Sequence, residues 1–186
     1  QLLTAGVVLA ILFASVTNAA AGPARTPPGP DIDSDEFVSA IDNPYFPLTP
    51  GTTFIYEGES DGTPTRIETT VTGDTKVILG VTTTVVHDQA FEDGVLVEDT
   101  FDWYAQDSDG NVWYFGEDTR ELDEDGNVIS TEGSWEAGVD GAEPGIIMEA
   151  HPQVGDRYHQ ELYKGVAEDQ AKVLELDESI CVEYGC

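Results

Sequence analysis

Two acidic, turn-like segments contain the first residues in this sequence that could do chemistry. The segments DSDGN (107–111) and DEDGN (123–127) place oxygen-bearing side chains at alternate positions, as calcium-binding loops do. An EF-hand also needs a Glu at its twelfth position, where this chain has Asp118, and a helix on each side. Because Asp-Gly is also a common hairpin turn, we interpret both segments as turns. The candidate ligands for a divalent cation are Asp107, Asp109 and Asn111.

Two carboxylates near aromatic residues are the second candidate. Asp99 interrupts the apolar side of a strand-like run, and Asp102 directly precedes Trp103 and Tyr104. A carboxylate pair can supply the acid and the base of glycoside hydrolysis. With 37 Asp and Glu residues in the chain, however, an acid beside an aromatic residue is expected by chance. A secreted polysaccharide hydrolase is therefore the alternative hypothesis and not the first one.

The sequence offers little for other chemistries. A zinc site would require the three histidines, at positions 87, 151 and 159, to converge. There is no Gly-x-Ser-x-Gly turn for a serine nucleophile, no phosphate-binding glycine loop and no dinucleotide fingerprint. We therefore expect no cofactor, and a non-enzymatic role before a catalytic one.

The charge balance excludes several classes of partner. The chain has 37 Asp and Glu residues against 7 Lys and Arg, which gives a net charge of −30. Such a surface repels phosphate and does not favour nucleic acid or anionic membranes. Adaptation to high salt is the first interpretation, because salt screens the self-repulsion of an acidic surface. An acidic family from an ordinary habitat and functional binding of cations are the alternatives.

The N-terminal residues predict export. Residues 2–21 form an apolar run that ends in three alanines, as a secretory signal peptide does, although the charged start of such a peptide is missing. A transmembrane anchor is the alternative, but the run is short, and prolines follow it. We expect a signal peptide at 1–21, a Pro-rich linker at 22–30 and one β-rich domain at 31–186. The protein would then be secreted, extracellular or periplasmic, without a transmembrane anchor after signal removal.

The two cysteines, Cys181 and Cys186, lie close together near the end of the chain. In a secreted protein this arrangement favours a disulfide over a metal site. The alternative is that they pair with partners beyond Cys186.

The residues Asp102–Glu117 organise the elements that position these groups. Aromatic-rich runs on both sides of the DSDGN turn predict a β-hairpin that anchors the core. Alternation within each strand lets only about half of these aromatic residues face one side. The aromatic residues on the other side must be covered by the Pro-rich segment at 43–51 and the Trp135 loop, or be offered to a ligand.

Short strands and turns account for most of the remaining chain. Residues Asp31–Ile41 predict a short helix, and Gly73-Asp74 a turn between two strands. Residues 133–145 predict an ordered loop with Trp135 tucked into the sheet. Residues 167–176 favour a strand over a helix, and residues 180–184 predict a last strand.

These elements predict a mainly β fold. We expect a single antiparallel curved sheet, half-barrel or barrel of short, hairpin-connected strands, with a short N-terminal helix. An immunoglobulin-type sandwich is disfavoured, because its Cys…Trp…Cys spacing is absent.

Three motifs carry a resemblance to a known group of proteins. They are NPYFPLTPGT (43–52), WYAQDSDGNVWYFGE (103–117) and GSWEAGVDGAEPGIIM (133–148). At these motifs the chain resembles a group of secreted, β-rich bacterial and archaeal proteins without an assigned activity. The resemblance covers about residues 42–176 and implies no catalytic residue. It also implies that further strands follow Cys186.

The first functional hypothesis is a secreted, non-enzymatic β-domain that binds a ligand or associates with the envelope or matrix through an aromatic surface. The partner would be a small molecule or a glycan. A polysaccharide hydrolase and a calcium-stabilised structural or adhesive module are the alternatives. The candidate ligand-binding residues are Trp103, Tyr104, Trp113, Tyr114, Trp135, Asp99 and Asp102.

Overall fold

The computed structural model describes residues 32–182 and residue 185, and it shows a mainly β fold. The strands are β1 (Phe37–Val38), β2 (Thr53–Ser60), β3 (Thr63–Ile78), β4 (Val81–Glu92), β5 (Val95–Asp107), β6 (Val112–Leu122), β7 (Val128–Ser130), β8 (Trp135–Glu136), β9 (Glu143–Met148), β10 (Arg157–His159), β11 (Glu161–Leu162) and β12 (Gln170–Lys172). Ten of them form one sheet whose main path is β11-β9-β6-β5-β4-β3-β2, and β10 pairs with β12 in a second sheet.

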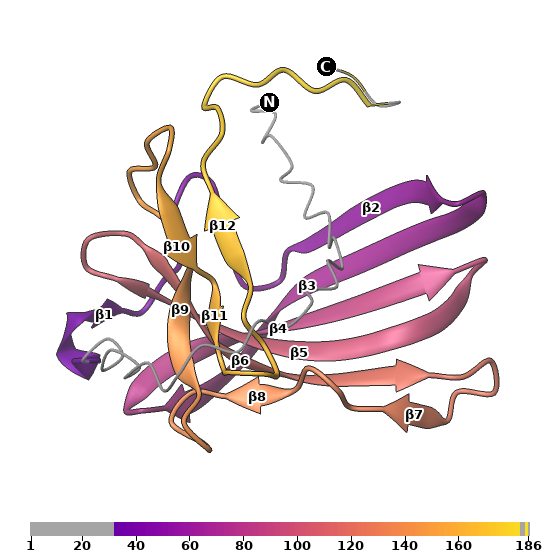
Figure 1. The fold of residues 1–186 in the computed structure, drawn as a ribbon, viewed down its shortest axis with the longest axis horizontal. Coiled ribbons are helices and arrows are strands. Elements are labelled where there is room, and N and C mark those ends of the chain that lie inside the picture. The colour runs from indigo at the N-terminus through magenta and orange to yellow at the C-terminus, as the bar shows by residue number, and fades with distance from the viewer. Residues whose placement is uncertain (1–31, 183–184, 186) are drawn as a thin grey trace, which may run out of the picture.

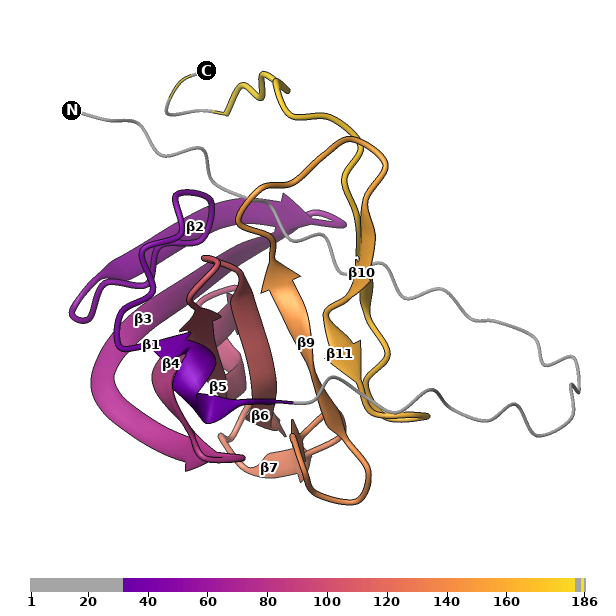
Figure 2. The same cartoon turned by 90° about the vertical axis from the view of Figure 1, so that its left-hand side faces the viewer.

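The main sheet is antiparallel and curved, as the sequence predicts. Strands β2 to β6 follow one another as hairpins and lie side by side in Figure 1. The short strands β9, β8 and β7 pair in turn along the free edge of β6. Figure 2 looks along the strands and shows the sheet bent into an open curve from β2 through β6 to β9. The expectation of a curved, hairpin-connected sheet is therefore confirmed.

The predicted N-terminal helix is not present. Only Ser34–Glu36 forms a single 3-10 turn, in which the Asp33 carboxylate accepts a hydrogen bond from Asp35 N at 3.0 Å. The chain then enters β1, and Phe37 packs edge-on against Phe115, with ring centroids 5.6 Å apart. Pairing with β5 and this aromatic contact outweigh the weak helix propensity of the segment.

The predicted turn at Gly73-Asp74 is also wrong. Strand β3 runs through both residues, and its pairing with β4 is irregular between Val71 and Thr75. The Thr72 hydroxyl donates to the Val85 carbonyl at 2.7 Å, across this irregularity. Bulges of this kind bend a strand and increase its twist, so these residues help to curl the sheet instead of ending a strand.

Several other expectations can be compared with the structure. Strand β12 lies within 167–176, which confirms the choice of strand over helix, and Trp135 is buried with 4% exposure, as predicted. Within 180–184, Val182 makes only an isolated bridge with Gly185. The signal peptide, the linker and Cys186, the predicted disulfide partner of Cys181, lie outside the described residues. In the described part of the chain, no helix is long and apolar enough to cross a membrane.

An ion pair between distant strands shows towards which face the main sheet curls. Lys76 on β3 forms an ion pair of 2.7 Å with Glu136 on β8, although β4, β5 and β6 separate these strands in the sheet. This contact requires the sheet to curl towards the face that carries Lys76, which we call the inner face. Alternation and register place Val85, His87, Asp99, Phe101 and Trp103 on the same face.

We call the opposite side the back face. It carries Thr100, Asp102 and Tyr104 of β5, which are all buried. The segment that precedes β2 covers part of it, because Phe46 packs edge-on against Tyr104 at 5.4 Å. The Gln106 side chain accepts hydrogen bonds from the backbone N–H groups of Asp42 and Asn43, which fixes that segment. The Pro-rich segment therefore covers back-face aromatic residues, one of the two outcomes that the sequence left open.

The close approach of β6 and β8 provides the first test. Gly116 has φ of 127°, and a Cβ there would overlap the Trp135 carbonyl. We expect Gly116→Ala to destabilise the fold by about 3 kcal/mol or more, since backbone strain and steric overlap add. Gly126→Ala is the matched control, because Gly126 has φ of 80° but open space around it, and should cost about 1 kcal/mol. Urea unfolding measures both; equal losses would contradict a tight β6–β8 contact.

Candidate functional site

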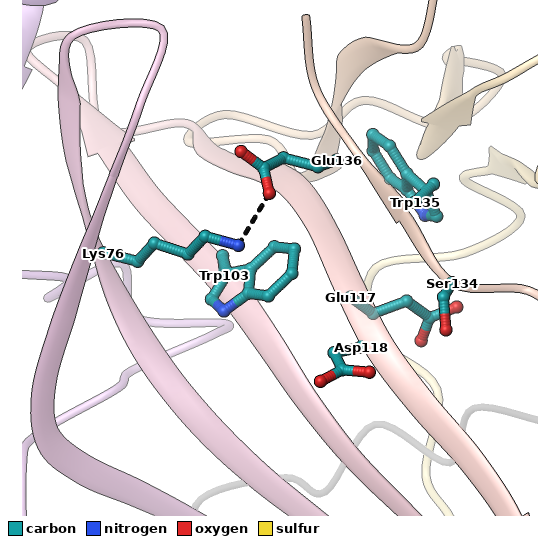
Figure 3. Close-up of a pocket in the computed structure, with 7 residues that line it drawn as sticks. All are labelled: Lys76, Trp103, Glu117, Asp118, Ser134, Trp135 and Glu136. Atoms are coloured by element: carbon teal, nitrogen blue, oxygen red, sulfur yellow. Dashed lines mark hydrogen bonds and ion pairs between the residues drawn. The ribbon is translucent and has the colours of Figure 1, made fainter. Parts of the chain in front are cut away.

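A depression of about 380 Å³ lies between β3, β5, β6 and β8, where Lys76, Trp103 and Asp118 of the inner face meet Glu117 and Trp135, whose cross-strand register puts them on the back face. Figure 3 shows Lys76 reaching from β3 towards Glu136 of β8, with Trp103 of β5 beneath them. Charged, hydroxyl and indole groups thus meet at one place. The lining residues are Lys76, Trp103, Glu117, Asp118, Ser134, Trp135 and Glu136.

Lys76 is the centre of this depression. Its ammonium lies 3.3 Å from the centroid of the Trp103 ring and donates to Glu136 Oε2 at 2.7 Å. A cation over an indole face is an attractive contact, and an ammonium has three donors. One of the three donors is used by Glu136. The face of Trp103 is therefore occupied by Lys76 and is not a flat platform on which a ligand could stack.

The segment that carries β8 is fixed to β6 by Ser134. Its hydroxyl accepts from Thr119 N at 3.0 Å and donates to the Thr119 carbonyl at 3.1 Å. Trp135 then packs edge-on against Tyr114, with centroids 5.4 Å apart, and its Nε1 donates to Glu161 of β11 at 3.3 Å. One wall of the depression is thus held by both polar and aromatic contacts.

A buried carboxyl network lies next to the depression. Asp102 and Glu117 are neighbours across β5 and β6. The Tyr114 hydroxyl lies 2.6 Å from Asp102 Oδ1 and 3.2 Å from Glu117 Oε2. Tyr104 stacks on Tyr114 at 4.8 Å. One phenol therefore links two carboxyl groups that lie in adjacent strands.

Burial raises the pKa values of both carboxyl groups. Desolvation raises the pKa of Asp102 to about 7, with a smaller contribution from the negative charge of Asp88. Desolvation, followed by the charges of Asp102 and Glu161, raises the pKa of Glu117 to about 8. The hydrogen bonds from Tyr114 oppose these shifts but do not cancel them. At neutral pH this pair therefore holds protons that ordinary surface carboxylates have lost.

The structure brings together some of the predicted ligand-binding residues but not all of them. Trp103 and Trp135 line the depression, whereas Asp102, Tyr104 and Tyr114 form the buried network beside it. Trp113 is elsewhere, since its ring packs on Phe37 at 6.2 Å and its Nε1 donates to Asp107 Oδ2 at 2.8 Å.

Asp99 and Asp102 do not face each other. Asp102 lies on the back face, whereas Asp99 lies on the inner face and accepts hydrogen bonds from His87 Nε2 at 2.7 Å and Gln89 Nε2 at 3.1 Å. These contacts explain why an acid interrupts the apolar side of that strand. The carboxyl group that lies beside Asp102 is Glu117.

The acidic side chains of the two turns accept hydrogen bonds that hold the turns in shape. The Asp107 carboxylate accepts hydrogen bonds from Asn111 N at 2.8 Å, Asn111 Nδ2 at 2.9 Å and Trp113 Nε1. Asn111 Oδ1 accepts from Ala150 N at 2.9 Å. Asp123 and Asn127 repeat this arrangement in the next hairpin. Among the described residues, no three His, Cys, Asp or Glu side chains are grouped so that they could hold a metal ion.

Sequence reasoning missed the residues that contribute most to the depression. Lys76 could have been noticed, because it is the only lysine before Lys164 in a chain of net charge −30. Glu117, Asp118 and Glu136 could not be distinguished among so many acids. The pairing of Glu117 with Asp102 depends on a register irregularity between Asp102 and Tyr104, which no sequence pattern reveals.

Comparisons with known proteins add no assignment. No protein-family model, no curated protein and no solved structure matches the chain. The resemblance to secreted β-rich proteins therefore stays a prediction, and the functional argument rests on the geometry of this chain.

The raised pKa of Asp102 predicts how stability depends on pH. Between its ordinary pKa of 3.8 and about 7, the folded state holds a proton that the unfolded state loses, so stability falls as pH rises through this window. The loss from Asp102 alone is on the order of 4 kcal/mol. Glu117 extends the loss in the same direction towards pH 8.

Substitution should remove this pH dependence. Asp102→Asn and Glu117→Gln keep the shape of each side chain but cannot ionise, so the decline in stability between pH 5 and 9 should become shallower in each variant. Asp125→Asn, in an exposed turn, is the control and should follow the wild type. Urea midpoints at several pH values measure the effect. Parallel curves for all four proteins would refute the buried, protonated pair.

Proposed function

We propose that this protein is an exported binding domain that holds a small, polar, hydroxyl-rich ligand, such as a unit of a glycan, in the depression around Lys76. The observation that carries the proposal is the convergence of Lys76, Glu136, Asp118 and two tryptophans around one volume of about 380 Å³. Ligand sites commonly occupy roughly 300–1,000 Å³ and combine apolar walls with a few polar groups.

The donors and acceptors in the depression support a hydroxyl-rich ligand. A sugar hydroxyl both donates and accepts, so it can accept from the Lys76 ammonium and donate to the carboxylates of Glu136 or Asp118. Lys76 and Glu136 are each about one-third exposed, at 35% and 36%, which leaves both within reach of a ligand. The edges of Trp103 and Trp135 supply apolar contact.

A secreted role is consistent with other features of the chain. The apolar run at 2–21 predicts export, and an acidic surface suits an extracellular protein in salt. Association with the envelope or matrix would follow if the bound glycan belonged to that structure. Binding without catalysis requires no residues other than those that line the depression.

Lys76→Met tests the proposal directly. The change keeps the length of the side chain but removes its donors and its charge, so we expect about a tenfold or greater loss of affinity for a ligand found in the wild type. Lys164→Met, at an exposed position outside the depression, is the matched control and should bind normally. A thermal-shift screen of sugars, lipids and divalent cations at low and high salt identifies the ligand. Calorimetry then measures each variant, and unchanged affinity in Lys76→Met would refute the site.

A carboxylate-dependent hydrolase is the second candidate, and the Asp102–Tyr114–Glu117 network favours it. With pKa values raised to about 7 and 8, these groups could donate or accept protons near neutral pH. Glu117 also lines the depression. The residues of this candidate are Asp102 and Glu117 and not Asp99, which lies on the opposite face.

Glu117→Gln separates the two candidates. If the protein hydrolyses a polysaccharide, this change should lower the release of reducing ends by about 100-fold or more, whereas Asp125→Asn should leave it unchanged. If the protein only binds, the wild type releases no reducing ends from any bound glycan.

A further inference from the structure

We propose that the binding site extends along the inner face from the Lys76 depression to His87 and Asp99, and that it takes an uncharged, chain-like glycan of several units. This inference rests on the proposed function and specifies its ligand. It is carried by the continuity of the inner face, by its exposure and by the balance of its charges.

The strip beside the depression is continuous in register. Asp118 of β6 lines the depression and is the cross-strand neighbour of Phe101, which in turn neighbours His87 of β4. Two residues further along the same face of β5, Asp99 lies between Gln89 and Arg120. From Trp103 to Asp99 the strand advances roughly 13 Å, which is longer than a single sugar ring.

The strip is accessible, whereas the reverse side of β5 and β6 is buried at Thr100 and Thr119. On the inner face, the side chains of His87, Asp99 and Arg120 are 27%, 22% and 42% exposed. On the back face, Thr100 and Thr119 are 3% and 6% exposed. Between Trp103 and Asp99, a ligand on the inner face therefore meets accessible polar side chains, whereas Thr100 and Asp102 behind them are buried and the back face of β5 is exposed only further on, at Glu98.

The polar groups of the strip keep hydrogen-bonding capacity. Asp99 Oδ1 takes part in the hydrogen bonds with His87 Nε2 and Gln89 Nε2. Arg120 donates to Asp118 through one terminal nitrogen at 2.8 Å. Carboxylate, imidazole, amide and guanidinium groups thus stand in a row, with ring surface from Phe101, which stacks on His87 at 4.3 Å. Such a row can contact successive units of a polymer that carries hydroxyl groups.

The charges on this face favour an uncharged occupant. Lys76 pairs with Glu136 and Arg120 with Asp118, whereas Asp99 shares hydrogen bonds with His87 and Gln89. Two ion pairs therefore cancel most of the charge on the strip, although the whole chain carries a net charge of −30. A polyanionic glycan would meet long-range repulsion from the protein, and a polycation would have to compete with Lys76 and Arg120 for the carboxylates that they pair with. A neutral oligosaccharide avoids both costs.

A chain-length series tests the proposal on the full chain. We would screen neutral and uronic-acid-containing glycans of one to six units and measure the affinities of the bound series by calorimetry. We expect affinity to rise at least tenfold from one unit to four or more units, and only for neutral glycans. Equal affinity for one and six units, or preference for an acidic glycan, would overturn the extended neutral site but leave the depression intact. Absence of binding to every glycan would overturn the proposed function itself.

The double variant His87→Ala/Gln89→Ala locates the extension. It should lose about tenfold in affinity for the longer glycans and be unchanged for the shortest one that binds. Thr82→Ala, an exposed position on the other face of β4, is the control and should match the wild type at every length. Tryptophan fluorescence checks that each variant is folded. If the double variant does not fold, the single change Gln89→Ala should show the same length dependence, and the absence of this dependence in a folded variant would overturn the extension.

Discussion

The contact of Lys76 with Trp103 and Glu136 is the constraint on which the shape of the sheet and the candidate site both depend. A lysine on β3 reaches a glutamate on β8 only because the three strands between them curl towards one face. The irregular pairing of β3 near Val71 and the close approach of β8 to Gly116 produce that curl. The same contact places an ammonium over an indole, next to a volume that a ligand could fill.

The distribution of charge gives this acidic chain two different sheet faces. On the inner face, Lys76 and Arg120 each form an ion pair with a carboxylate, and His87 shares a hydrogen bond with Asp99. On the back face, Asp102 and Glu117 share only the hydroxyl of Tyr114, and burial raises their pKa values. The carboxyl groups on the back face therefore keep protons near neutral pH, whereas the inner face presents ion-paired and hydrogen-bonded donors and acceptors.

This separation affects how the two candidate functions relate to each other. A binding site needs only donors and acceptors that are already accessible, such as Lys76 and Glu136, which are each about one-third exposed. Catalysis would need the carboxyl network as well, at the point where Glu117 meets the depression. Keeping the network buried costs stability as pH rises. Catalysis would give the protons of Asp102 and Glu117 a function that explains this loss of stability. Packing gives a second explanation, because Tyr114 contacts both Tyr104 and Trp135, and Trp135 belongs to β8.

The sequence by itself determined the mainly β class, the aromatic hairpin and the role of its acidic turn, since alternation and Asp-Gly-Asn chemistry act over a few residues. It did not determine that Phe37 enters a strand, that β3 continues through Gly73, or that Asp102 pairs with Glu117 and not with Asp99. These outcomes depend on register irregularities and on aromatic contacts between distant segments. Only tertiary structure settles them, because each is fixed by a neighbour that lies many residues away in the chain.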